Sequence, residues 1–163
     1  MKISYDELMK ILCYDPETGD FSWKISKQGI KKGRPVGFFN QGYKRIGVNR
    51  KEYPASHLAW LITYGRWPIG DIEHKDLNRS NNKISNLREA TRSQNMANGS
   101  LQSNNKSGYR GVFWRKGRRN WVATITVNGK THWLGSFKVK EDAGKAYKDA
   151  AEKYFGEFAR HLN

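Results

Sequence analysis

One stretch interrupts this chain of 163 residues and limits the size of any core that it can build. Residues 97–108, ANGSLQSNNKSG, are small, polar and without periodicity, which is typical of a linker. The segments on either side are each long enough for one small domain. The sequence therefore predicts two domains, residues 1–98 and 108–163, joined by a linker at 99–107.

The segment before the linker mixes short helices with short strands. Apolar spacing and turn residues predict a helix over 6–12, strands over 21–24, 43–48 and 51–53, and a helix over 57–64. Asn49 and Arg50 supply a hairpin turn between the second and third strands. The last helix is expected to end at Gly65.

The segment after the linker has a different pattern. Alternating residues predict three antiparallel strands over 109–114, 121–127 and 131–137, and Asn128-Gly129 suits a tight turn with positive φ. From Glu141 the apolar period becomes helical and stops at Gly156. The predicted fold class is α+β, with a small three-stranded antiparallel sheet packed on one helix in the second domain.

The charge of the chain favours a polyanionic partner. Thirty Lys and Arg face fifteen Asp and Glu, a net charge of +15, and the pI is near 10.0. Between Glu89 and Glu141 there are ten Lys or Arg and no acidic residue. Such a window indicates contact with phosphates rather than a mixed solvated face, although a merely soluble basic protein remains an alternative.

Two observations exclude other classes. Cys13 is the only cysteine, which excludes disulfides within the chain and zinc sites built from cysteines, and favours a reducing compartment. No apolar run approaches the ~20 residues of a membrane span, and residues 1–4 do not open a signal peptide. We therefore expect an intracellular protein without a membrane partner, and the sequence indicates no obligate protein partner.

The stretch IEHKDLNRSNNKISNLREATRSQNMAN, residues 72–98, holds the candidate chemistry. His74 has a side chain that can accept a proton near neutral pH, and Glu73 offers a hard carboxylate for Mg²⁺ or Mn²⁺. On an extended strand these neighbours point to opposite faces. Thr91 and Gln94 fit a capping box, so Asn95 falls early on a helix. The loop between the strand of His74 and this helix is expected to close through side-chain hydrogen bonds and to hold His74 in place. The side chains that could make these bonds belong to Asp76, Asn78, Asn81, Asn82 and Asn86.

The spacing of His74, Asn86 and Asn95 resembles the signature of HNH nucleases, in particular the homing type encoded by phages and introns. The resemblance extends loosely to YDPETGDFSWK near the N-terminus. It implies a ββα-metal unit with His74 on the first strand, residues 87–90 on the second and Asn95 on the helix. It further implies His74 as general base, Asn86 as the residue that pins the loop, and Glu73 and Asn95 as ligands of Mg²⁺ or Mn²⁺; catalytic roles thus fall to His74, Asn86 and Asn95.

Two positions depart from that pattern. The third signature position is Asn95 rather than histidine, a variant of the homing branch. Glu73 stands where aspartate is common, and its extra methylene makes direct metal ligation less secure than the role of His74.

Basic and aromatic residues alternate after the linker. Guanidinium groups bind phosphates or guanine edges, and aromatic rings pack on sugars or bases or build the core. The segment from YRGV through WLGSF to the end resembles the APETALA2 or ethylene-response-factor DNA-binding domain, whose sheet lies in the major groove. The resemblance implies DNA contacts by Arg110, Arg115 and Trp133, while Phe113 and Thr131 stand where relatives often carry arginine. The full predicted DNA-binding set is Arg110, Arg115, Lys116, Arg118, Arg119 and Trp133.

Together these features predict a metal-dependent DNA endonuclease of the homing type, directed to double-stranded DNA by its second domain. If phage- or intron-encoded, it would act in the cytoplasm of a bacterial host. One alternative is a non-catalytic DNA-binding regulator that keeps the HNH scaffold. Another is an RNA-binding protein that uses the same basic and aromatic surface.

Overall fold

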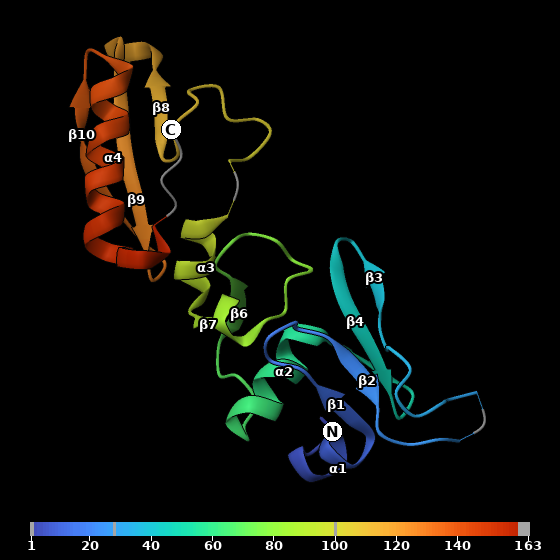
Figure 1. Ribbon diagram of the computed structural model, residues 1–163. Helices are drawn as coiled ribbons and strands as arrows, with labels where there is room; N and C mark the ends of the chain where they lie inside the picture. The colour runs from blue at the N-terminus through green and yellow to red at the C-terminus, as the bar shows by residue number, and fades with distance from the viewer. Residues whose placement is uncertain (1, 28, 100, 160–163) are drawn as a thin grey trace. The chain divides into compact units, whose positions relative to one another are not determined.

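The computed structural model describes residues 2–27, 29–99 and 101–159 of the chain (Figure 1). Its contacts divide the chain into two compact units, Met1–Glu89 and Ala90–Asn163. Both units combine helices with small sheets, which confirms the predicted α+β class. Within the described ranges no helix combines the length and apolar character needed to cross a membrane.

The first unit contains three small sheets and two helices around one core. Its elements are α1 (Tyr5–Ile11), β1 (Leu12–Tyr14), β2 (Phe21–Trp23), β3 (Phe38–Asn40), β4 (Tyr43–Val48), β5 (Lys51–Pro54), α2 (Ala55–Tyr64), β6 (Asp71–His74), the 3₁₀ turn η1 (Ile84–Asn86) and β7 (Leu87–Ala90). The sheets pair β1 with β2, β6 with β7, and β3, β4 and β5 in that order. The core packs apolar side chains from both helices against the strands, including Leu8, Phe21, Ile46, Leu58 and Leu61.

Local signals in the sequence account for several boundaries. The hairpin between β4 and β5 turns at Asn49 and Arg50, both with positive φ, as predicted. Gly65 ends α2 in the left-handed conformation at φ 68°, which only glycine adopts freely. The strands β1 and β3 were not predicted, because three residues are too short to show a period.

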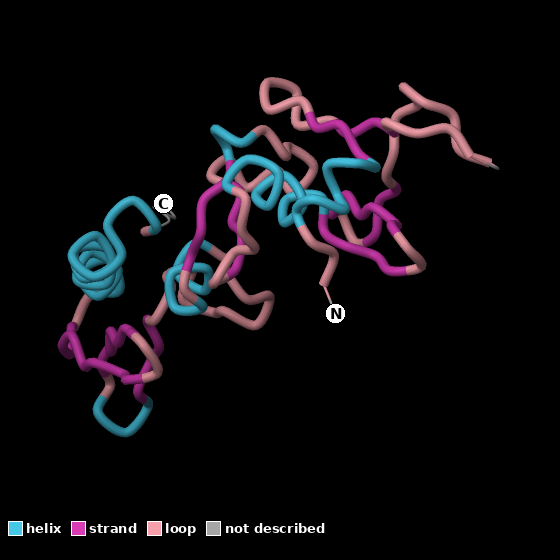
Figure 2. The backbone as a smooth tube through the Cα atoms, turned by 90° about the horizontal axis from the view of Figure 1, so that it is seen from below, coloured by secondary structure: helices cyan, strands magenta, loops and turns pink. Residues whose placement is uncertain are grey.

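The second unit is built on a three-stranded antiparallel sheet with one long helix on one face. Its elements are α3 (Arg92–Asn98), β8 (Val112–Arg115), η2 (Lys116–Arg118), β9 (Asn120–Val127), β10 (Lys130–Phe137), α4 (Lys140–Phe155) and η3 (Gly156–Phe158). The strand order is β10-β9-β8, and Figure 2 shows α4 nearly end-on beside the sheet. Asn128 and Gly129 turn with φ of 49° and 78°, which confirms the predicted hairpin.

The helix α3 packs within this second unit. Thr91 and Gln94 form the predicted capping box, and both of its reciprocal hydrogen bonds are present. Ala97 is buried against Ile125 and Phe155 of the sheet and of α4. The division by contacts therefore falls before α3, whereas the sequence predicts a first domain that runs to residue 98.

Candidate active site

His74 is the last residue of β6, and its side chain lies in a prepared hydrogen-bonding environment. The residue is 5% exposed, and its Nε2 lies 3.2 Å from Oδ1 of Asn82. The amide of Asn82 is oriented by a second hydrogen bond, because its Nδ2 donates to the carbonyl of Ser80 at 3.1 Å. Nε2 of His74 must therefore carry the proton that it donates, which leaves the lone pair of Nδ1 as the acceptor.

The protonation state of His74 suits a base. Burial lowers the pKa of His74 below its ordinary value, and the hydrogen bond with Asn82 offsets part of that effect. The ring is consequently neutral near pH 7, the form that can accept a proton. Asn82, expected from the sequence only to close the loop, is the direct partner of the imidazole.

Asn86 ties the loop after His74 into a closed structure. Its Oδ1 accepts from the backbone N–H of Asp76 at 3.1 Å, and its Nδ2 donates to Oδ1 of Asp76 and to the carbonyl of Asn81, both at 2.9 Å. Burial would raise the pKa of Asp76, but hydrogen bonds from Asn81 and Asn86 outweigh it and hold that pKa below its ordinary value. An ionised carboxylate at the centre of the loop thus accepts several hydrogen bonds at once.

The N-terminal turn supports the loop from behind. The hydroxyl of Tyr14 donates to the backbone carbonyl of Asn82 at 2.7 Å, and burial raises the pKa of that tyrosine. Gly19 approaches the backbone so closely that an added Cβ would lie 2.5 Å from N of Lys83. A chain of contacts therefore runs from β1 and the following turn through Asn82 to His74.

Glu73 precedes His74 on β6 and is also buried. Its side chain pairs with another residue than Asn82, the partner of His74. Its Oε2 accepts from Nε of Arg88 on β7 at 2.8 Å. Its Oε1 is also buried, and no hydrogen-bond partner for it is found in the described part of the chain. A carboxylate oxygen without a hydrogen-bond partner can bind a hard cation. Mg²⁺ fits this arrangement, because it usually takes only one or two protein carboxylates and completes its shell with water and substrate phosphates. Among the described residues, no cluster of three or more His, Cys, Asp or Glu could hold a metal alone.

The first unit thus brings together His74, Asn82 and Asn86, with Glu73 on the same strand as His74. Asn95, the remaining predicted site residue, lies on α3 of the second unit and is exposed there. Its role as a metal ligand stays a prediction.

The predicted DNA-binding residues of the second unit lie mostly on its surface. Lys116, Arg118 and Arg119 are exposed at and after η2, and Trp133 is 65% exposed on β10. Arg115 pairs with Asn120 and Trp133 with Thr124. Because opposite residues of an antiparallel sheet share a face, both side chains lie on the face away from buried Ala123 and Ile125, which pack towards α4.

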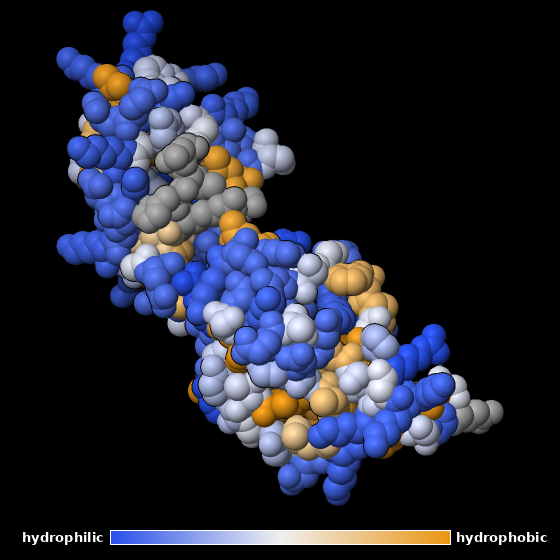
Figure 3. Space-filling model, in the orientation of Figure 1, coloured by the Kyte–Doolittle hydropathy of each residue, from blue (hydrophilic) through white to orange (hydrophobic). Residues whose placement is uncertain are grey.

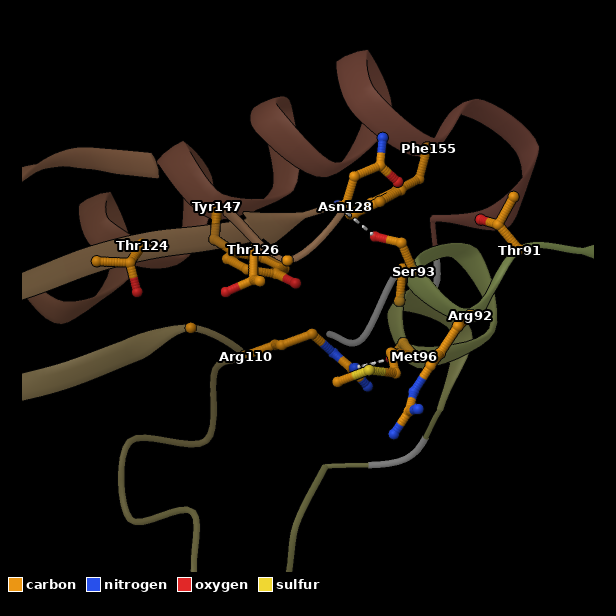
Figure 4. A pocket seen from close by; sticks show the side chains of 13 residues that line it. Thr91, Arg92, Ser93, Met96, Arg110, Thr124, Thr126, Asn128, Tyr147 and Phe155 are labelled. Carbon is orange, nitrogen blue, oxygen red and sulfur yellow. Dashed lines mark hydrogen bonds between the residues drawn. The ribbon is translucent and has the colours of Figure 1, made fainter. Parts of the chain in front are cut away.

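Arg110 differs from the rest of that set. Its guanidinium donates to the backbone carbonyls of Met96 and Gly99, at the C-terminal end of α3 (Figure 4). At the other end of α3, Ser93 accepts from the N–H of Asn128 at 3.1 Å. A pocket of about 740 Å³ lies beside these contacts within the second unit. Arg110 therefore binds carbonyls that the helix itself leaves unsatisfied.

Arg110→Ala is expected to loosen α3. Hydrogen bonds from a charged donor contribute roughly 1.5 to 3 kcal/mol each, so amide hydrogen exchange in residues 92–98 should accelerate strongly. Arg118→Ala, at an exposed position of η2, serves as the control and should leave that exchange unchanged. Unchanged exchange in Arg110→Ala, together with weaker DNA binding, would instead assign Arg110 to the DNA interface.

Comparison with known proteins gives two matches to family models. The model of the HNH endonuclease family matches residues 53–97, which include His74, Asn82 and Asn86. The model of the AP2 domain matches residues 107–157, the sheet and α4 of the second unit. The two matches agree with the resemblances that the sequence motifs indicate.

Two viral proteins are similar to this chain over most of its length. An uncharacterized HNH endonuclease of Acanthamoeba polyphaga mimivirus is 34% identical over 145 residues, covering 88% of this chain and 68% of the relative. Protein 3.8 of Escherichia phage T7 is 35% identical over 109 residues, covering 66% of this chain and 89% of the relative. No solved structure matches significantly.

Proposed function

Because this chain belongs to the HNH endonuclease family and carries an AP2 domain, we propose that it is an endonuclease that hydrolyses phosphodiester bonds of double-stranded DNA. The observation that carries the proposal is the hydrogen bond between His74 and Asn82, which leaves Nδ1 as a proton acceptor. A neutral imidazole that is held in one orientation can act as a general base when a water molecule lies within hydrogen-bond reach of Nδ1.

In the proposed reaction, Nδ1 of His74 takes a proton from a water molecule. The water oxygen then attacks the phosphorus, and the bond to the 3′ oxygen breaks on the opposite side. The imidazolium that forms keeps its Nε2–H bonded to Asn82, so the amide stabilises the charged ring. Asn86 holds the loop around Asp76, which keeps the ring in one orientation throughout.

A divalent cation belongs to this proposal as the resident cofactor. When bound, Mg²⁺ or Mn²⁺ would neutralise charge on the phosphate and on the leaving oxygen. Glu73 would hold it through the buried Oε1. Asn95 is the further ligand that the resemblance to HNH nucleases implies. The ion pair of Glu73 with Arg88 would keep the carboxylate in place, since it uses only the other oxygen.

The AP2 domain would supply most of the affinity for DNA. Lys116, Arg118 and Arg119 offer exposed cations for phosphates, and Trp133 offers an exposed ring on the sheet face opposite α4. Binding by this domain raises the local concentration of DNA at the nuclease. The phage source of one relative, protein 3.8 of Escherichia phage T7, supports a phage-type homing role in a bacterial host.

A plasmid assay tests the proposed function. With Mg²⁺, the full chain should convert supercoiled plasmid to the open circle and leave 5′-phosphate and 3′-hydroxyl ends, whereas chelation with EDTA should prevent it. We expect nicking rather than linearisation, because one chain carries one His74. Intact plasmid under all divalent cations, with DNA binding retained, would favour a non-catalytic regulator. Displacement of duplex DNA by single-stranded RNA at equal ionic strength would favour an RNA-binding protein.

A further inference from the structure

The hairpin formed by β3 and β4 carries an aromatic surface that the proposed reaction does not use. Phe38 and Phe39 on β3 are 43% and 63% exposed, and Tyr43 at the start of β4 is 38% exposed. We call Phe38 and Tyr43 the hairpin surface. Figure 3 shows hydrophobic atoms gathered over this hairpin. Clustered exposed aromatic side chains mark a place where a partner binds.

The hairpin surface continues directly from the His74 site. The rings of Tyr43 and His74 have centroids 6.4 Å apart, and the guanidinium of Arg79 lies 4.7 Å from the centre of the Tyr43 ring. The pairing of Asn40 with Tyr43 and of Phe38 with Arg45 places Phe38 and Tyr43 on one face of the hairpin, whereas Phe39, which pairs with Lys44, lies on the other. A ligand that reaches His74 would therefore also meet Tyr43 and Arg79.

The charge around this hairpin fits a polyanion. Between Asp20 and Glu52 the chain has nine Lys or Arg and no acidic residue. Two of these cations are paired, Lys44 with Asp20 and Arg45 with Glu52. The side chains of Lys31, Lys32 and Arg34 are exposed in the segment that leads into β3. A neutral protein partner would not explain the acid-free window, and aromatic rings beside such a window are typical of surfaces that bind nucleic acid.

We propose that the hairpin surface is a second DNA-contacting surface, which packs Phe38 and Tyr43 against duplex DNA beside the phosphate presented to His74. At Tyr43 and Lys44 the strand β4 pairs with β3 alone among the described strands. A two-stranded ribbon has dimensions that fit the major groove, where aromatic rings contact base edges and thymine methyl groups. Arg79 binds a neighbouring phosphate while it covers the Tyr43 ring. This inference rests on the proposed function, because the two share the His74 site.

The test measures binding by the full chain to a mixed-sequence duplex without divalent cations, so that cleavage does not interfere. The double variant Phe38→Ala, Tyr43→Ala should bind about tenfold more weakly. Its affinity should depend on salt with the same slope as the parent, because no charge is removed. Arg79→Ala should reduce that slope by about one phosphate contact. Ile69→Ala, an apolar residue 92% exposed in the same unit, is the matched control and should bind as the parent does.

The outcomes separate this inference from the proposed function. Unchanged affinity in the double variant, with plasmid cleavage intact, overturns the hairpin surface and leaves the nuclease standing. Weaker binding by the double variant, in a parent chain that cleaves no DNA, supports the hairpin surface while the nuclease proposal fails. Stronger binding of single-stranded RNA than of the duplex, lost in the double variant, overturns duplex DNA as the partner. Thermal unfolding of each variant near the parent's midpoint shows that the effect comes from the surface.

Discussion

His74→Ala is expected to reduce the rate of plasmid nicking by about 10²- to 10⁴-fold, the usual contribution of a general base. The alanine removes the imidazole whose Nδ1 is the proposed acceptor of the proton from water and whose Nε2 is held by Asn82. Affinity for DNA should persist, because the exposed cations of the second unit are untouched. Gel-based nicking rates and fluorescence anisotropy with the same protein would measure both quantities.

A histidine outside the site provides the control for this experiment. His132 is exposed on β10, where its ring stacks on Tyr154 at 5.5 Å between centroids, and His132→Ala should nick plasmid at the parental rate. Nicking that survives in His74→Ala would assign the base to another group and would leave the His74 hydrogen bonds with a structural role only. Loss of DNA binding along with cleavage would point to misfolding.

Gly19→Ala is expected to destabilise the first unit and to impair cleavage together. Gly19 has φ of +78°, which L side chains rarely adopt, and its added Cβ would lie 2.5 Å from N of Lys83 and 2.6 Å from C of Asn82. Strain and collision together should cost on the order of 3 to 5 kcal/mol of unfolding free energy. Because the collision involves the backbone of Asn82, the partner of His74 should shift and nicking should fall.

A second glycine separates backbone strain from the collision. Gly33 has a similar φ of +81°, but no atom of the residues that the structure describes lies within 4 Å of its would-be Cβ. Gly33→Ala should therefore cost only about 1 to 2 kcal/mol, the strain of a left-handed residue, and should keep the parental nicking rate. Denaturant titrations of both variants compare the two costs. Equal destabilisation by the two substitutions would show that the contact of Gly19 with the loop is unimportant.

Local patterns in the sequence determined most of the secondary structure. The capping box at Thr91 and Gln94, the turn at Asn128-Gly129 and the end of α2 at Gly65 were all predictable and are confirmed. Each depends on residues within four positions of one another, so backbone preference and short-range hydrogen bonds are sufficient to specify it. The two family resemblances likewise depend on short motifs, and the family comparisons confirm them.

Only the tertiary structure decided what surrounds His74 and what holds α3. The hydroxyl of Tyr14 reaches the carbonyl of Asn82 across 68 positions of sequence, and the guanidinium of Arg110 turns towards the carbonyls of α3 rather than lying open beside its basic neighbours. Neither contact has a period or a spacing in the chain, because each depends on how separate elements pack. The sequence by itself identified the imidazole and the class of partner; packing selected which asparagine orients the ring and which arginine secures the helix.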